Sequence, residues 1–210
     1  MPAREIPEFC EGDGTRSKIL KEAVRFFALK GFDGTSVKDI AKAVGIKTSS
    51  IYNYYESKET LLQDILACFE KRYWHYFDWL SKENAAAETL EQLVNNMINE
   101  EVIDMADPLG CFAISFILKE QHKNPAIRKY VFEFFWDHSI RSLKSDLDKA
   151  IERGLMPQCD TKIIAQTLLF NVLAVNDLRL HEYAGARALI DSKEIYRGIK
   201  KLLLILLSQG

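Results

Sequence analysis

Proline and glycine are scarce in this chain of 210 residues, with 5 and 10 copies, which excludes collagen-like and low-complexity architectures. Long apolar runs are also missing: the longest, Leu202 to Leu207, is far shorter than the roughly 20 residues that cross a bilayer. Residues 1–14 are polar and acidic and lack the apolar segment of a signal peptide. We therefore expect a packed protein that stays in the cytoplasm and has no membrane partner.

Cysteine and histidine are few and scattered. The 4 cysteines are Cys10, Cys68, Cys111 and Cys159, and their spacing fits neither a zinc site nor a disulfide framework. The 4 histidines form no HxxxH pair, which argues against a metal site. The chain also lacks the GxSxG, GxGxxG, P-loop and HExxH motifs of common enzyme classes. The sequence predicts no metal, no cofactor and no enzymatic activity.

Helical periodicity is the main signal that the sequence does contain. Hydrophobic residues, 48% of the chain, recur with the spacing of one helical face, and no useful stretch alternates with the period of a β-strand. The pattern predicts helices over 15–30, 37–44, 48–54, from Ser57 to a break at 84–88, 89–105, 109–122, 126–153, 161–183 and 192–208. We expect an all-α fold with a flexible tail over 1–14, a three-helix head over 15–60 and a larger helical body over 61–210.

Side chains at the predicted helix ends support these boundaries. Thr15, Ser36 and Ser57 belong to the residue types that cap a helix N-terminus by accepting a hydrogen bond from a backbone N–H. Gly31 and Gly45 are placed to end the first two helices, because glycine readily adopts the left-handed conformation common at that position.

Positive charge is concentrated in the head, although the formal net charge of the whole chain is only -2. Residues 15–55 contain eight basic and three acidic side chains, and no other stretch is clearly basic. Such an excess is typical of a DNA-binding surface, but many solvated helices are equally basic.

The stretch from Thr35 to Tyr55 has the pattern of a helix-turn-helix. That motif needs a small residue where its helices cross, a glycine in the turn and apolar residues that lock the second helix onto the first. Ala41, Gly45 and Ile51 stand at those places. The side chains left on the outer surface of the second helix are Thr48, Ser49, Tyr52 and Asn53. We expect them to form hydrogen bonds in a DNA groove, although Tyr52 also fits a core position.

At these residues the chain resembles the TetR family of repressors. The matching positions are Thr35, Ser36, Val37, Ile40, Ala41, Gly45, Ile51, Tyr52, Tyr54, Ser57, Lys58 and Leu61. The match is strong over residues 15–62 and looser in the body. Lys47 departs from the family's usual serine, which caps the recognition helix, so the cap is expected to pass to Thr48. Tyr55 stands where the family usually has phenylalanine.

The resemblance implies a transcription repressor that binds a palindromic double-stranded DNA operator as a homodimer and releases it when a small-molecule effector binds the body. It implies phosphate contacts for Thr35, Lys47, Tyr54 and Lys58, base contacts for Thr48, Ser49, Tyr52 and Asn53, and a place for Ser36 in the same DNA-binding set. Cations and hydroxyls suit phosphates, and short polar side chains suit base edges. Lys58 could also be an ordinary surface lysine. The helix dipole disfavours a cation at a helix N-terminus, so we expect this lysine to have a further role, such as the phosphate contact.

The resemblance also places the effector among the helices of the body, where aromatic residues are frequent. The candidate lining residues are Phe69, Tyr73, Phe77, Met97, Phe112, Phe116, Phe132, Phe135, Trp136 and Asn171. Any one aromatic residue at helical spacing is more often plain core than pocket. Asn171 lies in an apolar stretch and needs a neighbouring helix or a ligand to satisfy its amide. Together these residues predict an apolar or aromatic effector.

The last predicted helix is apolar on all sides. Ile195, Ile199, Leu202, Leu203 and Leu206 lie on one side, and Leu204, Ile205 and Leu207 lie on the other. A helix that is hydrophobic all round must be buried all round. We therefore expect a homodimer joined through helices 161–183 and 192–208, with Leu204 and Leu207 facing the partner. A central core helix of a monomer is the alternative.

Two rival functions stay open at this point. A protein of the same fold could bind DNA or a partner without any small-molecule ligand, and a ligand-induced loss of DNA affinity would separate the two cases. A purely structural helical bundle predicts no sequence-specific DNA binding at all.

Overall fold

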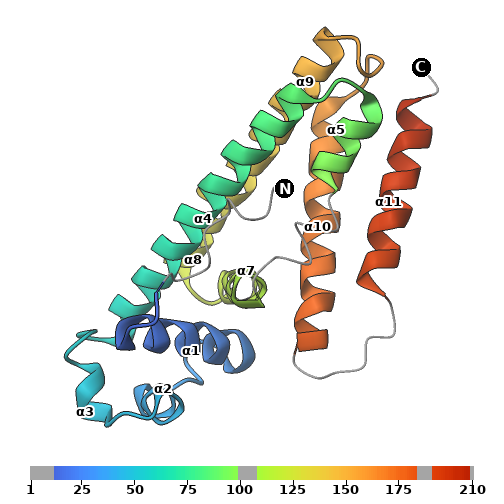
Figure 1. The fold of residues 1–210 in the computed structure, drawn as a ribbon. Helices are drawn as coiled ribbons and strands as arrows, with labels where there is room; N and C mark the ends of the chain where they lie inside the picture. Colours follow the sequence, from blue (N-terminus) through green and yellow to red (C-terminus); the bar gives the residue numbers. More distant parts are fainter. Residues whose placement is uncertain (1–11, 99–107, 184–190, 209–210) are drawn as a thin grey trace. The chain divides into compact units, whose positions relative to one another are not determined.

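A computed structural model describes residues 12–98, 108–183 and 191–208, and all regular structure in these ranges is helical (Figure 1). The elements are α1 (Thr15–Lys30), α2 (Val37–Val44), α3 (Thr48–Ile51), α4 (Lys58–Ala86), α5 (Leu90–Met97), α7 (Pro108–Glu120), α8 (Pro125–Tyr130), the π-helix η1 (Val131–Trp136), α9 (Asp137–Glu152), α10 (Thr161–Tyr183) and α11 (Ser192–Leu207). The predicted all-α fold class is confirmed. None of the described helices combines the length and apolar character needed to cross a bilayer.

The described residues form two compact units. The head unit contains α1 to α3, α4 as far as His75, and α7 and α8. The body unit contains the rest of α4, α5, η1 from Phe132 onward, and α9 to α11. This division differs from the boundary expected after residue 60, because α7 packs against α1 although about ninety residues separate them in sequence.

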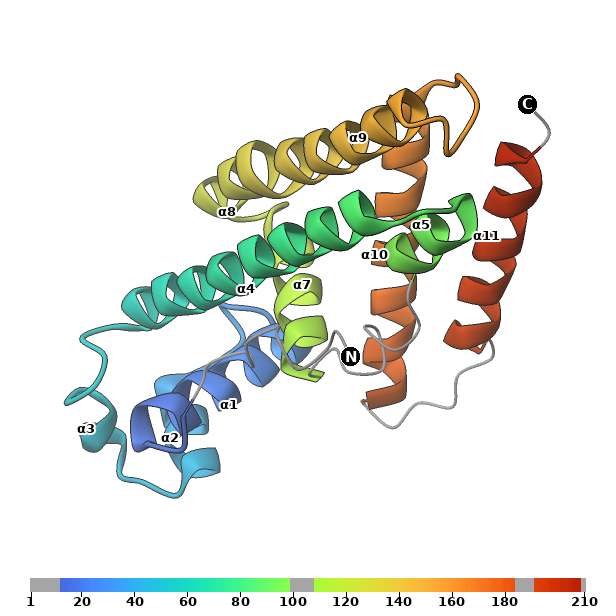
Figure 2. The same cartoon turned by 45° about the horizontal axis from the view of Figure 1, so that its top comes forward.

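The core of the head unit joins α1 to α7, which lies across it in Figure 2. Phe27 of α1 is buried, and its ring lies 5.1 Å from that of Phe32 and 5.3 Å from that of Phe116 on α7. Gly31 ends α1 with φ at +79°, and its N–H donates to the carbonyl of Phe27. This turn lets Phe32 fold back onto the helix, and Gly31 ends α1 as the sequence predicted.

Local capping explains most helix boundaries of the head. Ser36 and Asp39 exchange hydrogen bonds in a capping box at the start of α2, and these bonds from Ser36 lower the pKa of Asp39. Ser57 and Thr60 make the equivalent pair at the start of α4. The expected cap at Thr15 is wrong, because Thr15 is already helical and Gly14 at the N-cap makes no side-chain bond.

Three predicted helices differ from the observed ones. α3 is α-helical only to Ile51 and continues as a turn, so it is shorter than the expected 48–54. The expected helix over 126–153 is divided by η1 into α8, η1 and α9. α5 ends at Met97, and the rest of the expected 89–105 helix lies outside the described residues, as do residues 1–11 of the expected tail, with Cys10.

A buried polar network anchors the C-terminal end of α4 in the body unit. The carboxylate of Asp146 on α9 accepts hydrogen bonds from Ser81 (2.7 Å) and Asn84 (2.9 Å) on α4. Arg153 donates to the backbone carbonyls of Asn84 and Ala87. These bonds connect the end of α9 to the C-terminal end of α4. α9 also packs along α10, and α11 packs on both α5 and α10 (Figure 1).

Candidate nucleic-acid interface

The helix-turn-helix is built from α2, a turn over 45–47 and α3. Gly45 adopts φ +77° and ψ 30°, a left-handed conformation, and its N–H donates to the carbonyls of Ala41 and Lys42. Ala41 and Ile51 are 1% and 2% exposed, which confirms their predicted place between the two helices. The turn and the buried contacts therefore fix how α3 is presented.

A continuous polar surface runs along α3 and the turn after it. Lys47, Thr48, Ser49 and Asn53 are exposed, as are Tyr52 (55%) and Tyr54 (40%). The exposure of Tyr52 excludes the core position that its aromatic ring had left possible. All six side chains come from eight consecutive residues, so the α3 surface can present them together to one ligand.

Two basic residues of α2 were not assigned to the site from the sequence. Lys38 and Lys42 are both exposed, and neither forms an ion pair with any residue that the structure describes. The charge excess of residues 15–55 was the signal that could have identified them, because unpaired lysines beside a polar recognition surface suit phosphate contacts.

Thr35 and Ser36 serve the local structure of the head. Thr35 is 2% exposed, and its hydroxyl donates to the carbonyl of Gly31 at 2.9 Å. The hydroxyl of Ser36 belongs to the capping box of α2, although the residue itself is exposed. Their DNA contacts stay predictions, and Thr35 lies beneath the exposed surface in this conformation.

The ammonium group of Lys58 has three partners within the head. Its Nζ donates to the carbonyls of Phe32 (2.8 Å) and Thr35 (3.2 Å) and lies 4.2 Å from the centre of the Phe32 ring. These contacts explain a cation in the first turn of α4, where the helix dipole opposes it. The cap expected at Thr48 is wrong in the same region, because Lys47 occupies the N-cap of α3 without a side-chain bond.

Tyr55 fixes the segment that follows α3. The residue is 4% exposed, and burial raises the pKa of its hydroxyl to about 12. The guanidinium of Arg16 lies 5.0 Å from the centre of its ring and pairs with Asp64 at 2.6 Å. Tyr55 therefore packs as a neutral aromatic residue between α1 and α4, which is the role expected of phenylalanine at this position.

The candidate effector-lining residues do not form one described site. Phe69, Tyr73, Phe112 and Phe116 belong to the head unit, whereas Phe77, Met97, Phe132, Phe135, Trp136 and Asn171 belong to the body unit. Phe116 packs on Phe27, and Phe132 is 60% exposed. The amide nitrogen of Asn171 donates to the carbonyl of Thr167 on its own helix at 2.8 Å, so this N–H group is satisfied within α10. The effector site stays a prediction.

Large exposed apolar side chains occur on both α10 and α11 in the body unit, and we call them together the exposed face of α10 and α11. Its members are between 46% and 60% exposed and comprise Ile163 and Phe170 on α10 with Leu202, Ile205 and Leu206 on α11. The expectation that Leu204 and Leu207 face a partner is wrong for Leu207, which is buried, and Leu204 is half-buried in a groove beside α5. The reason is the rotation of α11, which turns Tyr196 and Leu207 inward.

No group of three or more potential metal ligands occurs among the residues that the structure describes. Cys68, Cys111 and Cys159 are free thiols, and burial is the main cause that raises the pKa of Cys159.

Comparison with known proteins places the helix-turn-helix in a recognised class. The family model for bacterial regulatory proteins of the tetR family matches residues 19–65, which include α2 and α3. IcaR, the HTH-type negative transcriptional regulator of the biofilm operon icaADBC in Staphylococcus aureus strain Newman, is 28% identical over 151 residues. That alignment covers 65% of this chain and 77% of IcaR.

Solved structures share the fold along most of the chain. Salmonella enterica GusR has a TM-score of 0.64 and 24% identity, with 92% of this chain and 95% of GusR covered. FadR from Bacillus subtilis in complex with stearoyl-CoA has a TM-score of 0.63 and 18% identity, with 89% and 96% covered. At these identities the two structures establish a common fold and nothing more specific.

We predict that Lys58→Met lowers the free energy of unfolding by about 1–2 kcal/mol, because two carbonyls lose a charge-assisted hydrogen bond while the side-chain stem is kept. Chemical denaturation followed by circular dichroism measures this change, with Lys58→Arg as the control that retains the charge. An unchanged stability combined with weaker DNA binding would instead make Lys58 a phosphate ligand with no structural role.

Proposed function

Because the chain belongs to the tetR family of bacterial regulatory proteins, we propose that it binds a palindromic DNA operator as a homodimer and releases it when a small molecule binds the body. The family identifies it as a repressor-like transcriptional regulator with a helix-turn-helix, and confirms the expectation that it is no enzyme. The palindromic operator, the homodimer and the effector are the proposed parts. The proposed location is the cytoplasm, because the operator DNA of a bacterial regulator lies there.

The observation that carries the proposal is the exposed surface of α3. A short helix fits the major groove, and hydroxyl and amide side chains on it can form hydrogen bonds with base edges. Thr48, Ser49 and Asn53 supply such groups, while Lys47 at the helix N-terminus suits a phosphate. The rings of Tyr52 and Tyr54 are exposed, and bound DNA would cover this apolar surface.

A second copy of the chain is the proposed cover for the exposed face of α10 and α11. An identical partner related by a two-fold axis buries the same face on both subunits. Gly198 lies one helical turn before Leu202, and no atom lies within 4 Å of the place where its Cβ would be. A glycine inside a helix costs about 1 kcal/mol relative to alanine. The close approach of a partner helix would explain a glycine at position 198.

The proposed effector is apolar or aromatic. Support comes from the many aromatic residues on α4, α7 and η1, and from FadR, a protein of the same fold whose structure contains stearoyl-CoA. A second candidate function lacks any effector. It is favoured by the packing of these aromatic residues on one another, as with Phe69 and Tyr73, whose rings stack at 5.7 Å.

For the head, we predict that Asn53→Ala changes the base preference of the bound DNA, because an amide can read base edges. Lys47→Ala should weaken binding to all sequences and lower the slope of log affinity against log salt by about one, because one phosphate contact is lost. Fluorescence anisotropy with selected and scrambled duplexes measures both. Lys149→Ala on α9 is the matched charge control, and wild-type behaviour of both head variants would refute the α3 assignment.

For the dimer, we predict that Leu202→Glu with Leu206→Glu converts it to monomers, because two carboxylates would have to lose their hydration in the interface. Sedimentation velocity of the full chain measures the change. Leu29→Glu, at an equally exposed leucine of α1, is the control and should leave the mass unchanged. A double variant that sediments as a dimer would rule out this face.

For the effector, we predict that apolar compounds that raise the melting temperature also weaken operator binding by roughly 5- to 150-fold, the range of a coupling of about 1–3 kcal/mol. DNA must weaken the binding of the same compound by the same factor. Anisotropy with and without each compound tests this. If compounds that bind tightly leave the DNA affinity unchanged, the second candidate function, which has no effector, is supported.

A further inference from the structure

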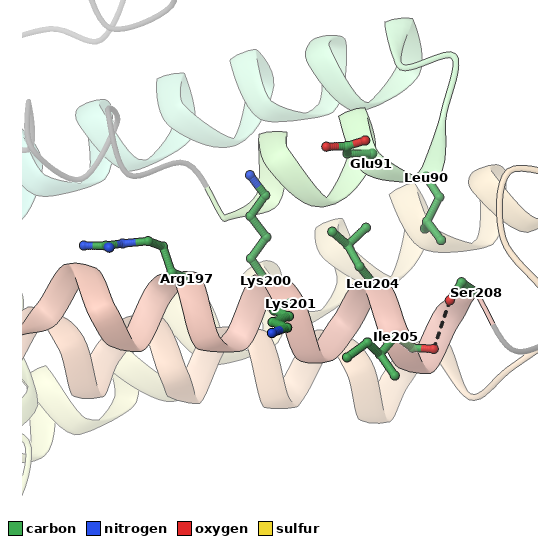
Figure 3. Close-up of a pocket in the computed structure, with 8 residues that line it drawn as sticks. All are labelled: Leu90, Glu91, Arg197, Lys200, Lys201, Leu204, Ile205 and Ser208. Atoms are coloured by element: carbon green, nitrogen blue, oxygen red, sulfur yellow. Dashed lines mark hydrogen bonds between the residues drawn. The ribbon is translucent and has the colours of Figure 1, made fainter.

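A groove of about 480 Å³ lies between α5 and α11 in the body unit (Figure 3). None of its lining residues is among the aromatic candidates for the effector site. Leu90 of α5 and Leu204 and Ile205 of α11 supply its apolar surface. Figure 3 shows Leu204 reaching from α11 toward α5, so the apolar groups are contributed from both walls. The volume lies within the range of about 300–1,000 Å³ that is usual for small-molecule sites.

The charges of the groove are unbalanced. Arg197, Lys200 and Lys201 line it from α11, and Glu91 is the one carboxylate among the lining residues. Neither Lys200 nor Lys201 forms an ion pair with any residue in the described part of the chain. Lys200 is only half-exposed, and it extends alongside α5 in Figure 3. Two cations without an ion-pair partner among the described residues therefore lie in the groove next to apolar surface.

We propose that this groove binds an amphiphilic organic anion. The acidic group would lie on Lys200 and Lys201, and the apolar part would cover Leu90 and Leu204. A purely apolar ligand would leave the two ammonium groups without a partner, and a simple inorganic anion would leave the leucines exposed to water. One molecule in the groove would contact both helices, α5 and α11.

The role goes beyond the proposed repressor function, because binding here requires neither DNA nor an occupied aromatic site. It also has a structural consequence for the dimer. Ile205 belongs both to the groove and to the exposed face that includes Leu202 and Leu206. If that face is the proposed subunit contact, the bound anion lies at its edge.

The test is calorimetric titration of the full chain with decyl phosphate and, in parallel, decanoate, each below its micelle concentration. We expect one molecule bound per chain, with an affinity that falls as salt is added because the lysines attract the head group. Lys200→Gln with Lys201→Gln should weaken binding about tenfold or more. Lys149→Gln with Lys162→Gln, an equal charge change on α9 and α10, should leave it unchanged.

Three results would overturn the proposal. The first is the absence of binding by either amphiphile, and the second is equal binding by the Lys200→Gln, Lys201→Gln variant, which would locate the amphiphile elsewhere. The third is sedimentation of the protein with phosphatidylglycerol vesicles without binding of monomeric amphiphile, which would indicate a membrane surface. Weaker binding of both inorganic phosphate and decanol than of decyl phosphate would support it, because the groove then requires charge and apolar chain together.

Discussion

The ammonium group of Lys58 holds the head of this protein in one arrangement. It joins the first turn of α4 to the carbonyls of Phe32 and Thr35, which lie between α1 and α2. The same loop is held from the other side by Glu120 of α7, whose buried carboxylate accepts a hydrogen bond from the N–H of Phe32 at 3.3 Å. The position of α2, and through it that of α3, depends on these two charged groups.

This arrangement explains why the head shares a compact unit with α7. A helix-turn-helix of about thirty residues has too little core to be rigid alone, and Phe116 of α7 supplies the missing apolar contact with Phe27. A shift of α7 would therefore be felt at the N-terminus of α2 through Glu120 and Phe32. Within the head unit, one hydrogen bond and one aromatic contact therefore connect α7 to the segment between α1 and α2.

Each of the three surfaces exposes groups that a partner of matching chemistry could cover. The α3 surface exposes two tyrosine rings, and the face of α10 and α11 exposes five large apolar side chains. The groove beside α5 contains leucines and two lysines that form no ion pair with any described residue. DNA, a second subunit and an amphiphilic anion are the partners whose chemistry matches each surface in turn. The α3 surface lies apart from the other two in sequence, whereas the groove and the exposed face of α10 and α11 share Ile205.

The sequence by itself determined the helix-turn-helix and the all-α class, because their signals are local. The helix cap at Ser36, the left-handed Gly45 and the inward Ile51 act between residues a few positions apart, and the structure confirms all three. Tertiary structure decided what depends on distant residues: the partners of Lys58, the packing of α7 on α1, and the side of α11 that stays exposed. Periodicity shows that α11 is apolar all round, but only packing against α5 and α10 selects which leucines are buried.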